Sequence, residues 1–260
     1  MGVLFLLNYT YRRRNYTCVL QSAATFSRER GSARAPMARK TQPMTAGKDP
    51  SGEQLAENRR AALRLVPVSR ETGDRLAAYV DLLARWRKTT NLIAESTLPS
   101  VWTRHIADSA QLLALAPTAR RWIDMGSGAG FPGLVIAIQL ADVPGAVVHC
   151  IESDQRKCAF LREAVRATGA AATIHSARVE AIDVASLGAV DAVTARAFAP
   201  LPLTLKLART WIERGAVGVF PRGESAKDQV AALPEATAYA IEVLPSLVDE
   251  RSAILRVRQS

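Results

Sequence analysis

The chain reads Arg121-Trp-Ile-Asp-Met-Gly-Ser-Gly-Ala-Gly-Phe-Pro-Gly133 at the point that decides its fold. A short apolar run up to Met125 opens into a loop of four glycines, and an apolar helical pattern follows at 134–140. A strand that turns through glycines into a helix is how open α/β sheets form a cofactor crevice. Glycine permits positive φ angles and lets a ligand approach the main chain closely. We therefore expect Gly126 and Gly128 to border a cofactor site.

The glycines alone leave the cofactor class open. Gly128, Gly130 and Gly133 match the G-x-G-x-x-G pattern of dinucleotide sites, which place a pyrophosphate at a helix N-terminus. Asp124, directly before the loop, favours S-adenosylmethionine, because a carboxylate attracts that cofactor's cationic end and repels a pyrophosphate. Glu152 ends the next apolar run and can accept hydrogen bonds from ribose hydroxyls in either class. A purely structural glycine turn is the third interpretation.

The positive charge is unevenly distributed along the 260 residues. The net charge is +10, from 34 Lys and Arg against 24 Asp and Glu, and +7 of it lies in residues 1–50. The remaining sequence is only mildly basic, so its charge gives little support for nucleic-acid binding. We interpret residues 1–50 as a disordered basic extension or a mis-assigned start, with a transit peptide as the alternative.

The sequence gives no sign of a membrane or metal partner. No apolar run approaches the roughly 20 residues that a membrane-spanning helix needs. The three cysteines and three histidines lack the spacing of a zinc site, and we expect Cys150 and Cys158 to be packed in the core. Because a sparse cysteine count fits a reducing compartment, we expect a cytoplasmic protein without a bound metal.

The order of the expected elements predicts an α/β fold. Apolar periodicity predicts helices at 53–65, 69–88 and 98–115, and together these form a small helical cap at 51–117. Residues 118–260 then alternate between strands (121–125, 146–151, 171–175, 190–195, 215–220) and helices (132–140, 155–168, 201–213, 225–232). Two strands at 237–244 and 252–258 form an antiparallel pair. We expect a doubly wound, mostly parallel sheet that ends in this pair.

Further polar residues follow the later strands and meet at the carboxyl edge of such a sheet. The Val179-Glu180 pair follows the third strand, where a backbone N–H and a carboxylate can bind an adenine edge; a plain helix start fits equally well. Arg196 follows the fourth strand and Arg222 the fifth, and a guanidinium binds phosphate or carboxylate through two hydrogen bonds. The alternative for Arg196 is a surface-loop arginine. His105 would line the crevice from the cap or simply be packed there.

Several signatures of other chemistries are missing. The fourth strand is not followed by an Asp/Asn-Pro-Pro-Tyr/Phe sequence or by Pro-Cys, which disfavours transfer to exocyclic amines and covalent attack by a thiolate. No Tyr-x-x-x-Lys pair supports hydride transfer at a carbonyl. A ring nitrogen with a free lone pair needs neither a thiol nor a strong base. An enzyme for such an acceptor mainly holds two reactants in line.

Taken together, these motifs resemble those of the bacterial small-subunit ribosomal RNA guanine-N7 methyltransferases, also called glucose-inhibited division protein B. The matching segments occur in the family's order, across roughly residues 55–258: Trp86–Leu92, Arg104–Ser109, Ile123–Gly133, Ala177–Glu180, Thr194–Phe198 and Phe220–Gly223. The resemblance implies a class I S-adenosylmethionine-dependent methyltransferase fold with an N-terminal helical cap. Residues 1–50 have no counterpart in the family pattern.

The resemblance also implies a set of site residues. Family members bind S-adenosylmethionine through positions that match Gly126, Phe131, Val179, Glu180 and Arg196. To these we add Asp124, Gly128 and Glu152 on the physical grounds given above. The family's substrate is one guanine of 16S rRNA within the 30S ribosomal subunit, and we expect Arg196 and Arg222 to hold that RNA and the protein to be a monomer. The family more often has lysine at the position of Arg222 and aspartate at that of Glu152, and arginine keeps the charge of lysine but not its geometry.

Two other functions remain open at this point. One is a NAD-dependent oxidoreductase, because the glycines match the dinucleotide pattern. The other is a non-catalytic RNA-binding module on the same fold, which would bind rRNA with a steep salt dependence and transfer no methyl group.

Overall fold

The structure is a computed structural model that describes residues 50–233 and 239–260. The extension predicted at 1–50 lies outside the described residues except for Pro50, and so do the first two residues of the strand predicted at 237–244.

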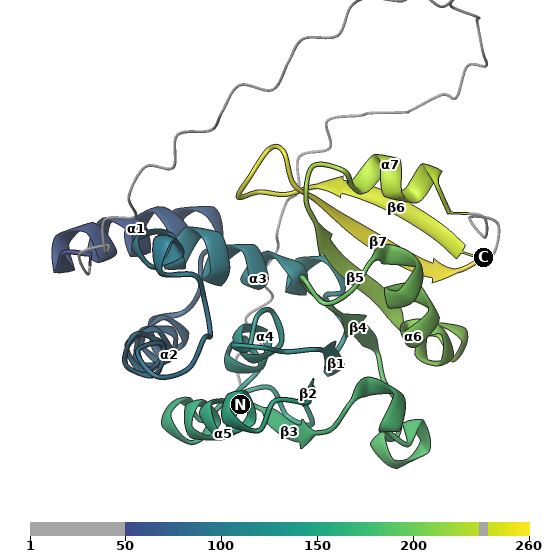
Figure 1. The fold of residues 1–260 in the computed structure, drawn as a ribbon, viewed down its shortest axis with the longest axis horizontal. Helices are drawn as coiled ribbons and strands as arrows, with labels where there is room; N and C mark the ends of the chain where they lie inside the picture. The colour runs from purple at the N-terminus through teal and green to yellow at the C-terminus, as the bar shows by residue number, and fades with distance from the viewer. Residues whose placement is uncertain (1–49, 234–238) are drawn as a thin grey trace, which may run out of the picture. The chain divides into compact units, whose positions relative to one another are not determined.

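Strand β1 (Arg121–Met125), which leads into the glycine loop, lies parallel to and between β2 (Val147–Glu152) and β4 (Ala192–Thr194). The described residues form a sheet of seven strands in the order β3-β2-β1-β4-β5-β7-β6 (Figure 1). The other strands are β3 (Ala172–Ser176), β5 (Val217–Arg222), β6 (Tyr239–Pro245) and β7 (Ala253–Gln259). β7 pairs antiparallel with both β5 and β6 and the other pairings are parallel, so the antiparallel pair predicted at the end of the sheet is confirmed. The strand order reverses between β1 and β4, which is where open α/β sheets form a ligand crevice.

Helices cover both faces of this sheet (Figure 1). One face carries α1 (Gly52–Leu65), α2 (Arg70–Trp86), α4 (Gly133–Gln139) and α5 (Gln155–Thr168), and the other α6 (Leu201–Glu213) and α7 (Ala226–Ala231). Successive side chains of a strand point to opposite faces. Trp122 accordingly packs in the hydrophobic core on the face covered by α1, α2, α4 and α5. Ile123 and Met125 pack in the core on the face covered by α6 and α7. The doubly wound, mostly parallel α/β sheet predicted from the sequence is confirmed.

The third predicted helix, 98–115, is wrong as a continuous element. The chain there forms a 3₁₀ turn (Glu95–Ser100), a π turn (Trp102–Ala107), one α turn, labelled α3 (Asp108–Ala110), and a second 3₁₀ turn (Gln111–Leu115). Pro99 lacks the N–H that a regular helix uses. The hydroxyls of Thr103 and Ser109 donate to the carbonyls of Ser100 and His105, which competes with the regular ladder. The apolar residues keep a helical spacing through these changes in winding, so the sequence pattern alone does not reveal the 3₁₀ and π turns.

The N-terminal helices share a core with the sheet. Leu76, Tyr79 and Leu83 of α2 pack in the same cluster as Leu134 of α4 and Phe160 of α5. The division into a cap at 51–117 and a sheet domain at 118–260 therefore stays a prediction. It rests on the change in secondary structure, because the hydrophobic core is continuous across this boundary. None of the helices in the described part of the chain is long and apolar enough to cross a membrane.

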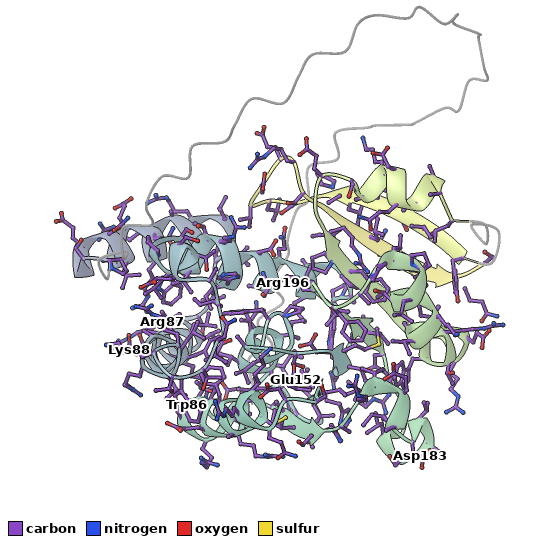
Figure 2. The ribbon with its side chains drawn as sticks, viewed as in Figure 1. Trp86, Arg87, Lys88, Glu152, Asp183 and Arg196 are labelled. Carbon is purple, nitrogen blue, oxygen red and sulfur yellow. The ribbon has the colours of Figure 1, made fainter. Side chains whose placement is uncertain are left out.

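Two side chains of α2 form hydrogen bonds with the glycine loop and with α5. The Tyr79 hydroxyl is buried and donates to the carbonyl of Ala129, inside the glycine loop. Trp86 lies where α2 approaches α5, and its Nε1 donates to Glu163 Oε2 at 3.1 Å (Figure 2). Helix α2 thus holds the glycine loop in place through Tyr79.

We predict that Tyr79→Phe destabilises the protein by about 1–3 kcal/mol, because the buried carbonyl of Ala129 loses its donor and finds no water. Urea unfolding followed by circular dichroism measures this change. Arg75→Ala is the matched control on the same helix: it removes an exposed ion pair with Asp142 and should change stability little. Equal stability of Tyr79→Phe and the wild type would contradict the assignment.

Candidate functional site

The glycine loop after β1 has backbone angles that favour glycine. Gly126, Gly128 and Gly130 have φ angles of 70°, 56° and 94°. The amides of Gly126 and Ser127 both donate to the carbonyl of Ile151, which holds the loop against the end of β2. A Cβ atom on Gly126 would collide with the ring of Phe198. The loop therefore needs glycine at this position for its conformation and for space.

Asp124 lies beneath the loop and not on the cavity surface. Its side chain is fully buried, and Oδ2 accepts a hydrogen bond from the Gly133 amide at 3.0 Å. A Cβ atom on Gly133 would lie 2.5 Å from Asp124 Cβ. The other carboxylate oxygen has no hydrogen-bond partner among the described residues. The carboxylate thus holds the start of α4 against β1, and the predicted contact with the cofactor's cationic end stays a prediction.

A cavity of about 420 Å³ opens beside the loop at the carboxyl edge of the sheet, within the usual size range of small-molecule sites. Glu152, from β2, and Arg196, which follows β4, are labelled in Figure 2. The structure brings together every predicted cofactor residue except Asp124, and these line the cavity: Gly126, Gly128, Phe131, Glu152, Val179, Glu180 and Arg196.

The sequence analysis missed three side chains that also line this cavity. Leu92 and Ile93 reach it from the segment after α2, and Lys157 reaches it from the first turn of α5. Leu92 and Ile93 form an apolar pair directly after a polar stretch and do not continue a helical pattern. This isolated apolar pair is the sequence feature that could have indicated their role. They supply an apolar wall of the kind a purine ring packs against.

Glu152 suits a ribose diol. The side chain is 8% exposed, and its two oxygens accept hydrogen bonds from the amides of Gly128 and Asp154, both at 2.8 Å. An ionised carboxylate has about four acceptor positions, so about two stay available for ligand hydroxyls. The two amide bonds fix the orientation of the carboxylate before any ligand binds. Together with the apolar wall, this donor and acceptor set fits a nucleoside such as that of S-adenosylmethionine.

Arg196 lies at the inner end of the cavity and is bound on several sides. Its Nη1 donates to Asp108 Oδ2 at 3.0 Å, its Nη2 donates to His105 Nδ1 at 2.8 Å, and the guanidinium lies 5.1 Å from the ring centre of Phe131. The next residue, Ala197, has a φ of 49°, which is rare outside glycine. Such backbone strain persists where the surrounding contacts impose it, and it often accompanies function.

His105 is a packed, neutral imidazole. Its ring stacks on Phe131 with centres 4.9 Å apart, and burial next to Arg196 lowers its pKa from 6.5 to about 3. Because Nδ1 accepts from Arg196, the proton of the neutral ring lies on Nε2, which faces Thr97 Oγ1 at 3.2 Å. His105 therefore positions Arg196. It is packed and it also lines the cavity, so both interpretations left open for it describe its place.

A second cavity of about 440 Å³ adjoins the first, and His105, Arg196 and Ala197 line both. Arg222 lines only the second cavity. It is half-buried, its Nη1 donates to the carbonyl of Ala199 at 2.9 Å, and its Nη2 donates to Thr204 Oγ1 at 2.8 Å. Burial lowers the pKa of this guanidinium. Arg222 thus holds the loop between β4 and α6, and its predicted contact with RNA stays a prediction.

The two cysteines within the described residues line neither of the two cavities. Cys150 and Cys158 are both buried, and burial raises the pKa of the Cys150 thiol, so neither is an activated nucleophile. Within 50–233 and 239–260, no group of three His, Cys, Asp or Glu side chains is placed to hold a metal ion.

Comparison with known proteins places these features in one family. The family described as rRNA small subunit methyltransferase G matches residues 73–252. The chain belongs to this family. It is 52% identical over 200 residues to the ribosomal RNA small subunit methyltransferase G of Nitrobacter hamburgensis, which covers 75% of this chain and 74% of that protein. It is 50% identical over 198 residues to the ribosomal RNA small subunit methyltransferase G of a Bradyrhizobium species, a match that covers 76% of this chain and 87% of that protein.

Solved structures resemble this chain less closely. MtNAS in complex with S-adenosylmethionine is 12% identical, covers 80% of each chain and has a TM-score of 0.48. A putative O-methyltransferase from Klebsiella pneumoniae is 14% identical, covers 80% of this chain and 98% of its own, and has a TM-score of 0.48. The fold is that of a class I S-adenosylmethionine-dependent methyltransferase, as the sequence predicted.

We predict that Gly126→Ala weakens binding of S-adenosylhomocysteine at least about tenfold, because the added methyl group displaces Phe198 from the cavity wall. Isothermal titration calorimetry measures the affinity. Gly145→Ala is the matched control: Gly145 also has a positive φ, 74°, but nothing lies within 4 Å of the added atom. Unchanged affinity in Gly126→Ala would show that the loop does not border the ligand.

Asp124 provides a pH-dependent test. Burial raises its pKa from 3.8 to about 6, so the folded protein binds the proton more tightly than the unfolded chain does. This group's contribution to stability is therefore full below about pH 4 and falls as the pH rises through 6. Asp124→Asn keeps an acceptor for Gly133 and does not titrate. Its stability relative to the wild type should rise by up to about 3 kcal/mol between pH 4 and pH 7.5 in urea unfolding. A constant difference across this pH range would contradict the buried charge.

Proposed function

We propose that this chain transfers a methyl group from S-adenosylmethionine to N7 of a guanine in 16S rRNA of the 30S ribosomal subunit. The observation that carries the proposal is the pair of adjoining cavities that share Arg196, His105 and Ala197. One cavity has the acceptors and apolar wall that fit a nucleoside cofactor, and the other leaves room for the base. Membership of the methyltransferase G family supports the same reaction.

The chemistry of a ring nitrogen fits the residues that are present. The bound cofactor supplies an electrophilic methyl group on a sulfonium. The N7 lone pair forms the new N–C bond as the S–C bond breaks, which yields S-adenosylhomocysteine and a cationic N7-methylguanine. No proton leaves N7, so the site needs no general base, and His105, whose pKa is about 3, supplies none. The chain's task is to hold the two reactants in line.

Arg196 suits the junction between the two ligands. Asp108 neutralises its charge at 3.0 Å, so a positive charge can develop on the guanine without opposition from a bare cation. Asp108 and the Arg104 carbonyl use the two donors of Nη1 and His105 uses one donor of Nη2, out of the five N–H donors of a guanidinium. We propose that a remaining donor binds guanine O6, which adenine replaces with an amino group.

Two exposed arginines line the cavities, together with the exposed carboxylate of Glu180. Arg178 lines the first cavity and Arg104 the second, and both are exposed. We propose that they contact rRNA phosphates, whereas Arg222 acts on the RNA only through the loop that it holds. Because the substrate is the 30S particle, we further propose that the protein works as a monomer in the cytoplasm.

The direct experiment uses purified protein, methyl-labelled S-adenosylmethionine and 30S subunits from cells that lack this enzyme. We predict that the label is recovered as N7-methylguanosine after nuclease digestion and chromatography. Arg196→Ala should lower kcat/KM on the order of a hundredfold, because one preorganised donor is lost at the reacting base. Arg214→Ala changes an exposed arginine in the loop after α6, remote from both cavities, and should retain the wild-type rate.

Three outcomes of this experiment separate the alternatives. RNA binding with a steep salt dependence but no label transfer would indicate a binding module. Binding of NADH in place of S-adenosylhomocysteine would indicate an oxidoreductase. Label in any nucleoside other than N7-methylguanosine would contradict the proposed acceptor atom.

A further inference from the structure

We propose that the second cavity is the binding pocket for the guanine base and that Asp249 reads the base through its N1–H and 2-amino groups. This inference rests on the proposed function and deepens it. Asp249 belongs to the hairpin between β6 and β7, more than 50 residues after Arg196 in sequence. It lines the second cavity and not the first.

The direction of the base follows from the position of the methyl group. N7 must face the first cavity, so the N7 and O6 edge of the purine lies against the wall that both cavities share, formed by His105, Arg196 and Ala197. The edge with N1–H and the 2-amino group adjoins this edge at O6, roughly at a right angle to it. We infer that this second edge faces the wall that the hairpin supplies, which contains Val248, Asp249 and Ser252.

Two carboxylates line this cavity, Asp108 and Asp249. Asp108 is ion-paired with Arg196 through Oδ2 and accepts from Gln111 on Oδ1. Asp249 Oδ1 accepts from the Arg251 amide at 3.0 Å and lies 3.4 Å from Arg251 Nε, whereas Oδ2 has only a 3.4 Å contact with the Ser252 hydroxyl, so Oδ2 is the more open oxygen for the base. The Arg251 amide holds the pKa of Asp249 below its usual range, so the group is an ionised acceptor. The two N–H donors of guanine match two acceptor positions on such a carboxylate.

A buried amide holds the hairpin in place. Gln111 is 4% exposed, and its Oε1 accepts from the Leu247 amide at 2.8 Å. Its Nε2 donates to Ser246 Oγ at 3.1 Å and to Asp108 Oδ1 at 3.0 Å. Because Asp108 also binds Arg196, one continuous set of hydrogen bonds connects the hairpin with the cavity wall that Arg196 forms. The distance between the O6 donor and the Asp249 carboxylate is thereby set before the base enters.

The contact with Asp249 strengthens during the reaction. Methyl transfer places a positive charge on the purine, which makes its N1–H and 2-amino groups better donors to a carboxylate. An interaction that is stronger in the transition state than in the bound ground state raises kcat and not only the affinity. Adenine offers an acceptor at N1 and no 2-amino group, so the same carboxylate disfavours it.

The test compares guanine with inosine at the target position of reconstituted 30S subunits, since inosine keeps N7, O6 and N1–H and lacks only the 2-amino group. We expect the wild type to methylate guanine at least about tenfold faster than inosine, as kcat/KM. Asp249→Asn keeps the acceptor for the Arg251 amide but offers the base an amide. It should lose more on guanine, which donates two hydrogen bonds to the carboxylate, than on inosine, which donates one, so its preference falls towards one.

Glu250→Gln is the matched control, because Glu250 is the exposed neighbour of Asp249, does not line the cavity and should keep the wild-type rate and preference. A merely structural role of Asp249 would lower both rates equally and preserve the preference, which would overturn the inference. Equal rates of the wild type on guanine and inosine would overturn it too. No transfer by the wild type to either RNA would instead overturn the proposed function itself, and the inference with it.

Discussion

The ion pair between Arg196 and Asp108 connects the parts of the site that come from distant stretches of the chain. Arg196 follows β4, and Asp108 lies 88 residues earlier in the irregular segment 95–115. Both side chains are less than 20% exposed, so the pair is shielded from solvent more than a surface ion pair. Gln111 extends the contact to the β6–β7 hairpin, and His105 extends it to Phe131. Removal of either charge would leave the other partly buried and without its ion-pair partner, which is destabilising.

The glycine loop depends on a second buried carboxylate with a different task. Burial of Asp124 beneath the loop raises its pKa to about 6, so its ionised form lowers the stability of the fold. The same carboxylate fixes the start of α4 through the Gly133 amide. Glu152 uses two backbone amides to orient its oxygens towards the cavity. Tyr79 supports the same loop from α2. The two carboxylates therefore have different roles: Asp124 fixes the conformation of the loop, and Glu152 is available to a ligand.

The sequence predicted the sheet well because its signals are local. The glycine loop and the apolar strands identify themselves by spacing, and the carboxyl edge then brings together residues such as Glu180 and Arg196. The winding of 95–115 was not predictable from periodicity, since hydroxyl-to-carbonyl bonds alter it without changing the apolar pattern. Asp249 was missed because its place depends on the contact between Gln111 and Ser246, which are 135 residues apart. No local pattern records such a contact.

The most direct test of the account is a crystal structure of the protein with S-adenosylhomocysteine and a guanosine nucleotide. We predict that the ribose hydroxyls bind Glu152 in the first cavity, that the base lies in the second, and that the sulfur and N7 face each other beside Arg196. A base bound outside the second cavity, or a sulfur turned away from Arg196, would contradict the central claim that the two cavities together form one transfer site.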